Sequence, residues 1–262
     1  MSSVFQKLTN VTMPAGYELR ALPVVGSTND VAKELIGEIE NGDLREDTHY
    51  VIVAEMQTGG RGRTGRSWSS PAGNLYCSIL IPDIGDLAQA AQLSFVTAIA
   101  MRNAIASLIG LSDVKCKWPN DIMINGQKTC GILLECGTNR KKRNWLIVGT
   151  GANVAWHPED TPYKTTHLTQ FNTQIDYVDL LENYLSEFKA KYSEWRDFGF
   201  ERCRSEWLSH GFAIGERIVA RLSEARQEEG VFLDLDKSGA LILEKADKSR
   251  MTITAGDVFL RG

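Results

Sequence analysis

Residues 50–81 read YVIVAEMQ, TGGRGRTGRSWSSPAG and NLYCSILI in order. The first and last of these runs are rich in β-branched and aromatic residues and have the length of a buried strand. The run between them, residues 58–73, is rich in Gly, Ser and Arg and therefore predicts a loop. We expect a glycine- and arginine-rich loop that joins two strands of one sheet.

Further strands and helices are predicted on both sides of this unit. The helices follow a helical repeat of apolar residues, and Asn125-Gly126 is typical of the tight turn of a β-hairpin. So few long helices among so many strands favour an α+β fold with a mixed β-sheet rather than a regular alternation of strands and helices. The predicted strands are 17–25, 50–57, 74–81, 114–118, 121–124, 129–135 and 145–154, and the predicted helices are 31–36, 87–109 and 177–198.

After Gly211 the pattern changes to short alternating strands with turn residues between them. Four strands are expected, at 217–222, 230–235, 240–244 and 251–254. About fifty residues of this kind predict a small SH3-like β-barrel. The chain is therefore expected to form two domains, residues 1–211 and residues 212–262.

Composition excludes several classes of protein. A net charge of −4 argues against a general nucleic-acid binder. The apolar stretches 74–82 and 87–110 are interpreted as too short or too interrupted to cross a membrane, and the N-terminus does not resemble a secretion signal, which favours the cytoplasm. Five cysteines and four histidines lack the spacing of a disulfide framework or a zinc site.

The loop itself predicts a site for an anion. No Asp or Glu occurs between Met56 and Pro82, whereas Arg61, Arg63 and Arg66 fall within six residues. Guanidinium groups can bind phosphate oxygens in pairs, and the nearby glycines allow the backbone to come close to a ligand. The loop has neither the lysine of a P-loop nor the following helix of a dinucleotide fold. Taken alone, it is equally consistent with an exposed or RNA-binding loop.

Four other segments favour a ligand-binding site over an exposed or RNA-binding loop. They are Ser27-Thr28-Asn29, Lys117-Trp118-Pro119-Asn120-Asp121, Lys128 with the run 131–135, and Gly149-Thr150-Gly151-Ala152-Asn153. Together with 57–70, and in this order, they closely resemble the biotin protein ligases over nearly the whole chain. Ala152 stands where that family usually has a larger aliphatic residue. Because only 26 residues precede Ser27, the resemblance is to monofunctional ligases without the N-terminal DNA-binding domain.

This resemblance implies an activity. The family activates biotin with ATP and Mg²⁺ to biotinyl-5′-AMP, and then transfers biotin to a lysine in the biotin-accepting domain of a carboxylase. The expected partners are thus biotin, ATP and that domain, with no nucleic acid and no membrane, in a monomer or homodimer. Lipoate or octanoate transfer by a related fold, and a non-catalytic nucleotide- or RNA-binding protein, are the alternatives.

The resemblance also assigns roles to residues. Arg63, Arg66 and Lys128 would stabilise charge on the phosphates, and Asp121 would hold the metal ion. Asp121 is also a candidate base for the acceptor lysine, although a turn aspartate that binds local amides is as good an interpretation. The loop 155–175 is expected to cover the adenine. The ligand-binding set implied for biotin and ATP is Ser27, Thr28, Asn29, Gln57, Gly60, Arg61, Arg63, Arg66, Trp68, Asn120, Lys128, Gly131, Gly149, Gly151 and Asn153.

Three of these residues have plainer alternatives. Ser27 and Thr28 could cap a helix, alone or in addition to binding biotin. Trp68 could be a core residue instead of packing on the ligand, and Lys128 could be an exposed residue of a strand. The sequence does not decide between these interpretations.

Overall fold

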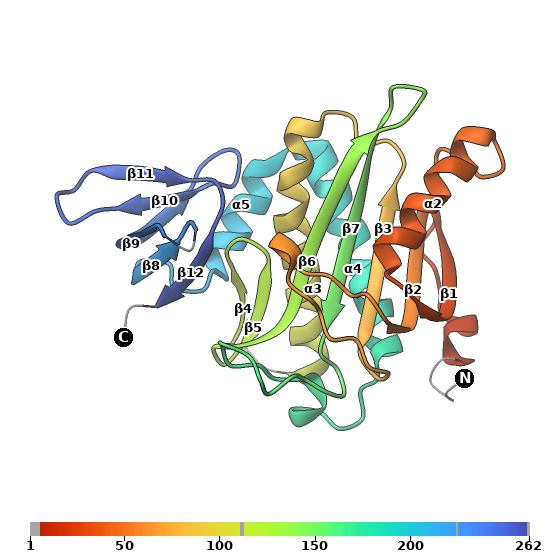
Figure 1. The fold of residues 1–262 in the computed structure, drawn as a ribbon, viewed down its shortest axis with the longest axis horizontal. Helices are drawn as coiled ribbons and strands as arrows, with labels where there is room; N and C mark the ends of the chain where they lie inside the picture. Colours follow the sequence, from red (N-terminus) through yellow and green to blue (C-terminus); the bar gives the residue numbers. More distant parts are fainter. Residues whose placement is uncertain (1–5, 111–112, 224, 261–262) are drawn as a thin grey trace.

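The computed structural model describes residues 6–110, 113–223 and 225–260. Its larger sheet has the strand order β1-β2-β3-β7-β6-β5-β4 (Figure 1). Strands β1 and β2 are parallel, and the other neighbours are antiparallel. The predicted mixed sheet is therefore confirmed. The strands are β1 Tyr17–Val25, β2 His49–Gln57, β3 Leu75–Ile81, β4 Val114–Lys117, β5 Asp121–Ile124, β6 Gln127–Thr138 and β7 Asn144–Ala152.

Helices cover both faces of this sheet (Figure 1). Side chains of a strand alternate between its faces, and β2 shows the result: Tyr50 and Ile52 pack in a cluster with α2, whereas Val51 and Val53 belong to the main core with α3 and α4. The helices are α2 Thr28–Asn41, α3 Leu93–Ile109, α4 Tyr177–Phe198 and α5 Phe200–Ser209, with short 3-10 turns η1 Leu8–Asn10, η2 Arg63–Gly65, η3 Leu87–Gln92 and η4 Leu168–Gln170.

The segment Leu87–Ile109 corrects one expectation. By length and mean hydropathy, 1.3, it could span a membrane, contrary to the sequence interpretation. In the fold it forms η3 and α3, and α3 is buried between the sheet and α4. A core helix of this kind is apolar around most of its circumference because protein covers most of it.

The β5–β6 hairpin has the predicted turn. Asn125 and Gly126 both have positive φ angles, 50° and 72°, as a two-residue type I′ turn requires. The two strands pair antiparallel, with a register shift between Ile122 and Met123. This hairpin carries Asp121 at one end and Lys128 just after the turn, so two predicted site residues lie on adjacent strands.

The C-terminal sheet has the strand order β11-β10-β9-β8-β12. Within the described residues its two edge strands, β11 and β12, do not pair with each other, so the predicted barrel is not closed. The fifth strand, β12, and helix α5 were not expected from the sequence. The sheet lies beside α5 and β4–β5 (Figure 1), and the Trp118 indole donates to the Gly239 carbonyl at 3.0 Å. The strands are β8 Arg217–Arg221, β9 Gln227–Leu235, β10 Leu241–Glu244, β11 Arg250–Ile253 and β12 Asp257–Leu260.

Candidate functional site

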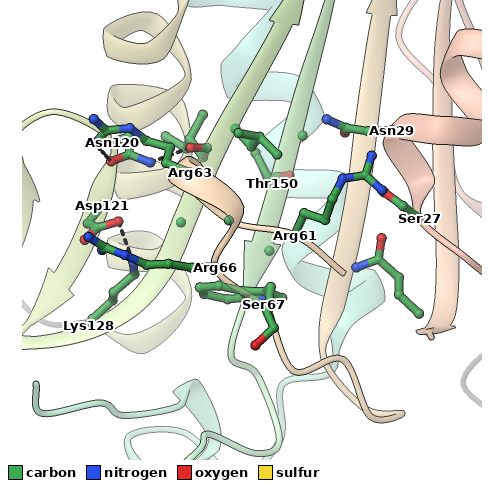
Figure 2. Close-up of a pocket in the computed structure, with 18 of the residues that line it drawn as sticks. Ser27, Asn29, Arg61, Arg63, Arg66, Ser67, Asn120, Asp121, Lys128 and Thr150 are labelled. Carbon is green, nitrogen blue, oxygen red and sulfur yellow. Dashed lines mark hydrogen bonds and ion pairs between the residues drawn. The ribbon is translucent and has the colours of Figure 1, made fainter. Parts of the chain in front are cut away.

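A pocket opens on the α2 face of the large sheet, under the loop that follows β2. All the ligand-binding and catalytic residues expected from the sequence line it, except Gly60 and Asn153. Figure 2 shows that the loop crosses the front of the pocket, with Arg61 directed toward Ser27 and Asn29 and with Arg63 and Arg66 directed toward the β5–β6 hairpin. The fold thus gathers segments that are far apart in the sequence into one site.

Gln57 is the centre of a network of hydrogen bonds at the α2 end of the pocket. Its Oε1 accepts from the Thr28 backbone N–H at 2.9 Å and lies 3.2 Å from Thr28 Oγ1, and its Nε2 donates to Ser70 Oγ at 3.0 Å. The Ser78 hydroxyl lies 2.7 Å from Thr28 Oγ1 and 2.6 Å from Asn29 Oδ1. Buried and fixed in this way, these groups suit a small neutral ligand that carries both N–H and C=O groups.

Ser27 occupies the N-cap of α2 with extended backbone angles, as the sequence suggested. Its side chain makes no capping hydrogen bond, and Thr28 bonds to Gln57 instead. The interpretation of these residues as helix-capping side chains is therefore wrong for both. Their polar groups face the pocket.

A second network, at the rim, holds Arg61. Its guanidinium forms two hydrogen bonds with Asp30, at 2.7 and 2.6 Å, and lies 3.9 Å from Glu135. Glu135 also accepts from Asn29 at 2.6 Å and from Lys33 at 2.7 Å. Arg61 is thus held against α2, apart from the other two arginines of the loop (Figure 2).

The Asp30 carboxyl is expected to titrate below its ordinary pKa of 3.8, because its hydrogen bonds to Arg61 outweigh the effect of burial, and the charges of Arg61 and Lys33 add to them. A depressed pKa means that the ion pair is present above pH 3.8 and is lost as the pH falls through the lower folded value. Arg61→Ala should raise the titration midpoint of Asp30 toward 3.8, as followed by carboxyl carbon NMR. An unchanged midpoint would contradict this assignment.

Arg63 and Arg66 lie at the opposite end of the pocket. Arg63 donates to Asn120 Oδ1 at 3.0 Å and to the Gly256 carbonyl at 3.4 Å, and its Nη1 lies 3.8 Å from Asp257. Arg66 pairs with the same aspartate at 2.5 Å. The C-terminal sheet therefore supplies, from the start of β12, the carboxylate that holds both arginines.

Lys128 and Asp121 form an ion pair of 2.6 Å (Figure 2), with 15% and 18% of their side chains exposed. Burial opposes the lysine charge, but the attraction of Asp121, the nearby Tyr163 and the hydrogen bond to Asp121 outweigh it, so the pKa of Lys128 lies above its ordinary value. Lys128 is therefore a charged ammonium group at the edge of the pocket. The interpretation as an exposed strand residue is wrong.

Glycines form the floor where β6 and β7 pass beneath the pocket. A Cβ on Gly149 would lie 2.4 Å from Asn29 Oδ1, and one on Gly151 would lie 2.5 Å from Trp68 Nε1. A Cβ on Gly131 would come within 3.1 Å of the Trp68 ring. Only glycine allows these close approaches. Trp68 thus lies over the pocket floor rather than in the protein core.

Gly60 and Asn153 lie just outside the pocket lining. The Gly60 carbonyl accepts from the Trp68 backbone N–H at 2.9 Å, so Gly60 joins the two ends of the loop. Asn153, 2% exposed, directs its amide to the Thr166 carbonyl at 3.1 Å. Asn153 therefore holds the loop that follows β7.

Four residues line the pocket without having been predicted as site residues from the sequence: Tyr163, Thr150, Ser67 and Asp257. Tyr163 could have been noticed in the sequence, because it is the only tyrosine in the 155–175 loop. No local signal marked Asp257, because its role depends on how the two sheets pack. Within the described part of the chain, no group of three or more His, Cys, Asp and Glu is placed to hold a metal ion.

Comparisons with known proteins agree with this arrangement. The Biotin/lipoate A/B protein ligase family matches residues 22–153, and the Biotin protein ligase C terminal domain matches residues 213–261. The biotin--[acetyl-CoA-carboxylase] ligase of Paracoccus denitrificans is 34% identical over 218 residues, which cover 80% of this chain and 90% of that protein.

Two solved structures extend the comparison. Biotin protein ligase from Aquifex aeolicus in complex with biotin and ATP has 26% identity and a TM-score of 0.76, covering 93% of this chain and 98% of that one. The Leishmania major enzyme in complex with biotinyl-5-AMP has 26% identity and a TM-score of 0.65, covering 92% and 100%. The first matched region contains most of the residues that line the pocket, and the second contains Asp257. Because both regions match and the Paracoccus denitrificans relative is 34% identical, the chain belongs to the biotin protein ligase family.

Proposed function

We propose that this protein is a biotin protein ligase, which activates biotin with ATP to biotinyl-5′-AMP and then transfers biotin to a lysine of a carboxylase domain. One observation carries the proposal. A fixed set of neutral hydrogen-bonding groups around Gln57 lies in the same pocket as the cations Arg63, Arg66 and Lys128. Biotin needs both, because its ureido ring is neutral and polar while its carboxylate must meet the phosphates of ATP.

In the first step a biotin carboxylate oxygen attacks the α-phosphorus, and the bond to pyrophosphate breaks. Negative charge then builds on the α-phosphate and on the leaving group, and fixed cations stabilise it. Lys128 would contact the carboxylate and the α-phosphate, and Arg63 and Arg66 the phosphates. Arg61 would leave Asp30 and close over the bound acid, while Trp68 excludes water from the anhydride.

In the second step the neutral amine of the acceptor lysine attacks the acyl carbon, AMP leaves, and the nitrogen loses its proton.

The oxygen atoms that could bind Mg²⁺ in this pocket belong to the Asp121 carboxylate and the Asn120 amide. Such a small oxygen set suits an ion held mainly by the phosphates of ATP. Bound there, Mg²⁺ would neutralise phosphate charge. The base for the acceptor lysine, the oligomeric state, the cytoplasmic location and the domain boundary at 211/212 stay predictions.

The same pocket weighs against the two alternatives. The dithiolane of lipoate and the alkyl chain of octanoate lack N–H and C=O groups for the polar groups of this pocket to bind, so either would displace water from them without replacing its hydrogen bonds. A protein that only binds RNA through the basic loop has no use for Lys128, which is turned inward against Asp121.

The proposal is tested by biotin-dependent exchange of labelled pyrophosphate into ATP, with lipoate and octanoate in parallel reactions. Exchange with biotin alone is expected, together with the addition of one biotinyl group to a carboxylase acceptor domain in the presence of Mg²⁺, seen by mass spectrometry. Exchange with lipoate but not biotin would overturn the choice of substrate. Salt-sensitive RNA binding without any exchange would support the non-catalytic alternative instead.

A further inference from the structure

The Lys128 ammonium group lies close to two aromatic rings that come from two different loops. Its Nζ is 5.5 Å from the centre of a Trp68 ring and 5.3 Å from the centre of the Tyr163 ring. Asp121 completes the surroundings at 2.6 Å. An ammonium within about 6 Å of a ring centre is attracted by the ring face. Three side chains therefore fix the position of one catalytic charge.

Tyr163 is held there by the backbone of the lysine that it covers. The Lys128 N–H donates to the Lys164 carbonyl at 2.9 Å, and the Thr166 N–H donates to the Lys128 carbonyl at 3.0 Å. Asn153 fastens the same segment through the Thr166 carbonyl at 3.1 Å. We call residues 163–166 the strap. Because the strap is tied to Lys128 itself, the ring of Tyr163 keeps its place relative to that side chain.

The other two neighbours of Lys128 have further tasks in the proposed reaction. Asp121 would bind the metal ion, and Trp68 would pack on biotinyl-AMP, so both would change partners when the substrates arrive. Tyr163 is the contact that the proposed mechanism leaves in place. It comes from the strap, not from the basic loop that closes over biotin.

We propose, on the basis of the function proposed above, that Tyr163 is a positioning residue, whose ring holds the Lys128 ammonium in place while Asp121 and Trp68 engage the substrates. The contribution comes from the aromatic face, not from the hydroxyl. It acts on the rate of adenylate formation, because Lys128 must already be in position when charge develops on the α-phosphate.

The experiment compares Tyr163→Phe, which keeps the ring, with Tyr163→Leu, which removes it. Lys164→Ala is the matched control, because Lys164 belongs to the strap, has an exposed side chain and does not line the pocket. Loss of one cation–π contact should lower the kcat of pyrophosphate exchange about tenfold in Tyr163→Leu. The KM for biotin should stay unchanged, and Tyr163→Phe and Lys164→Ala should behave like the wild type.

The split between kcat and KM, together with rescue by Tyr163→Phe, supplies a readout that a purely structural role would not give, because a general distortion of the pocket would also raise the KM for biotin. If Tyr163→Leu does not fold, judged by thermal melting, Tyr163→Met gives the same comparison.

Three outcomes would overturn the inference. An unchanged kcat in the ringless variant means that the ring does not position Lys128. Equal losses in the Phe and Leu variants mean that the hydroxyl acts, and a change confined to the KM for ATP means that the ring contacts the nucleotide. Failure of the proposed function looks different, because the wild-type protein would then show no biotin-dependent exchange.

Discussion

Lys128→Ala should lower the rate of biotin-dependent pyrophosphate exchange about 100- to 1000-fold, the usual effect of removing one preorganised group that stabilises transition-state charge. The fold should survive. Asp121 loses its 2.6 Å partner, but 18% of its side chain is exposed, so the free energy of unfolding should fall by only about 1–3 kcal/mol. Exchange kinetics and thermal melting on the same preparations separate the two effects.

Lys115→Ala is the control for charge. Lys115 lies on β4, at the edge of the same sheet, has 47% of its side chain exposed and lies 4.0 Å from Asp113. Its removal changes the net charge as Lys128→Ala does, yet it should leave exchange unchanged. A Lys128→Ala enzyme that works at the wild-type rate would refute the role assigned to this lysine.

Gly149→Ala should weaken biotin binding about 10- to 100-fold, as measured by titration calorimetry. The added methyl group would lie 2.4 Å from Asn29 Oδ1 and 3.0 Å from its Cγ, so the Asn29 amide has to move. It would then lose its hydrogen bonds to Ser78 and Glu135, next to the groups that bind the ureido ring. Misplaced hydrogen-bonding groups and overpacking each cost about 1–3 kcal/mol.

Gly37→Ala is a control that should change the stability of the protein in the opposite direction. Gly37 lies within α2, and a Cβ there would meet nothing within 4 Å. The same substitution should therefore stabilise the protein by about 1 kcal/mol, since alanine favours a helix over glycine, and leave biotin affinity unchanged. If both alanine variants bind biotin like the wild type, the floor of the pocket does not constrain the ligand as described.

Much of the architecture could be predicted from the sequence, because periodicity and turn chemistry are local. The Asn125-Gly126 turn and the α4 helix lie where their patterns indicated. Helix α5 follows α4 after the single residue Gly199, so its pattern was not separated. Strand β12 was not expected either, and without it the C-terminal sheet could not be described correctly.

The site was predictable to a similar extent and for a similar reason. Most of its lining residues lie in compact motifs, but their partners come from elsewhere in the chain. Asp257 is 191 residues away from Arg66, and Glu135 is 106 residues away from Asn29. No local pattern contains such a pairing. The structure also shows that the neighbours of Arg61 are acidic, which the basic sequence of its loop does not indicate.

The two ends of the pocket differ in how far along the chain their contacts reach. The side-chain hydrogen bonds of Gln57 and Thr28 join residues between 28 and 78, whereas the arginine end depends on residue 257 of the last strand. Proteins open in cooperative local units, each with its own free energy. An opening of the C-terminal sheet alone would therefore release Arg63 and Arg66 from Asp257 but leave the Thr28 amide bonded to Gln57. In native-state hydrogen exchange, the two ends of one pocket should have different lifetimes.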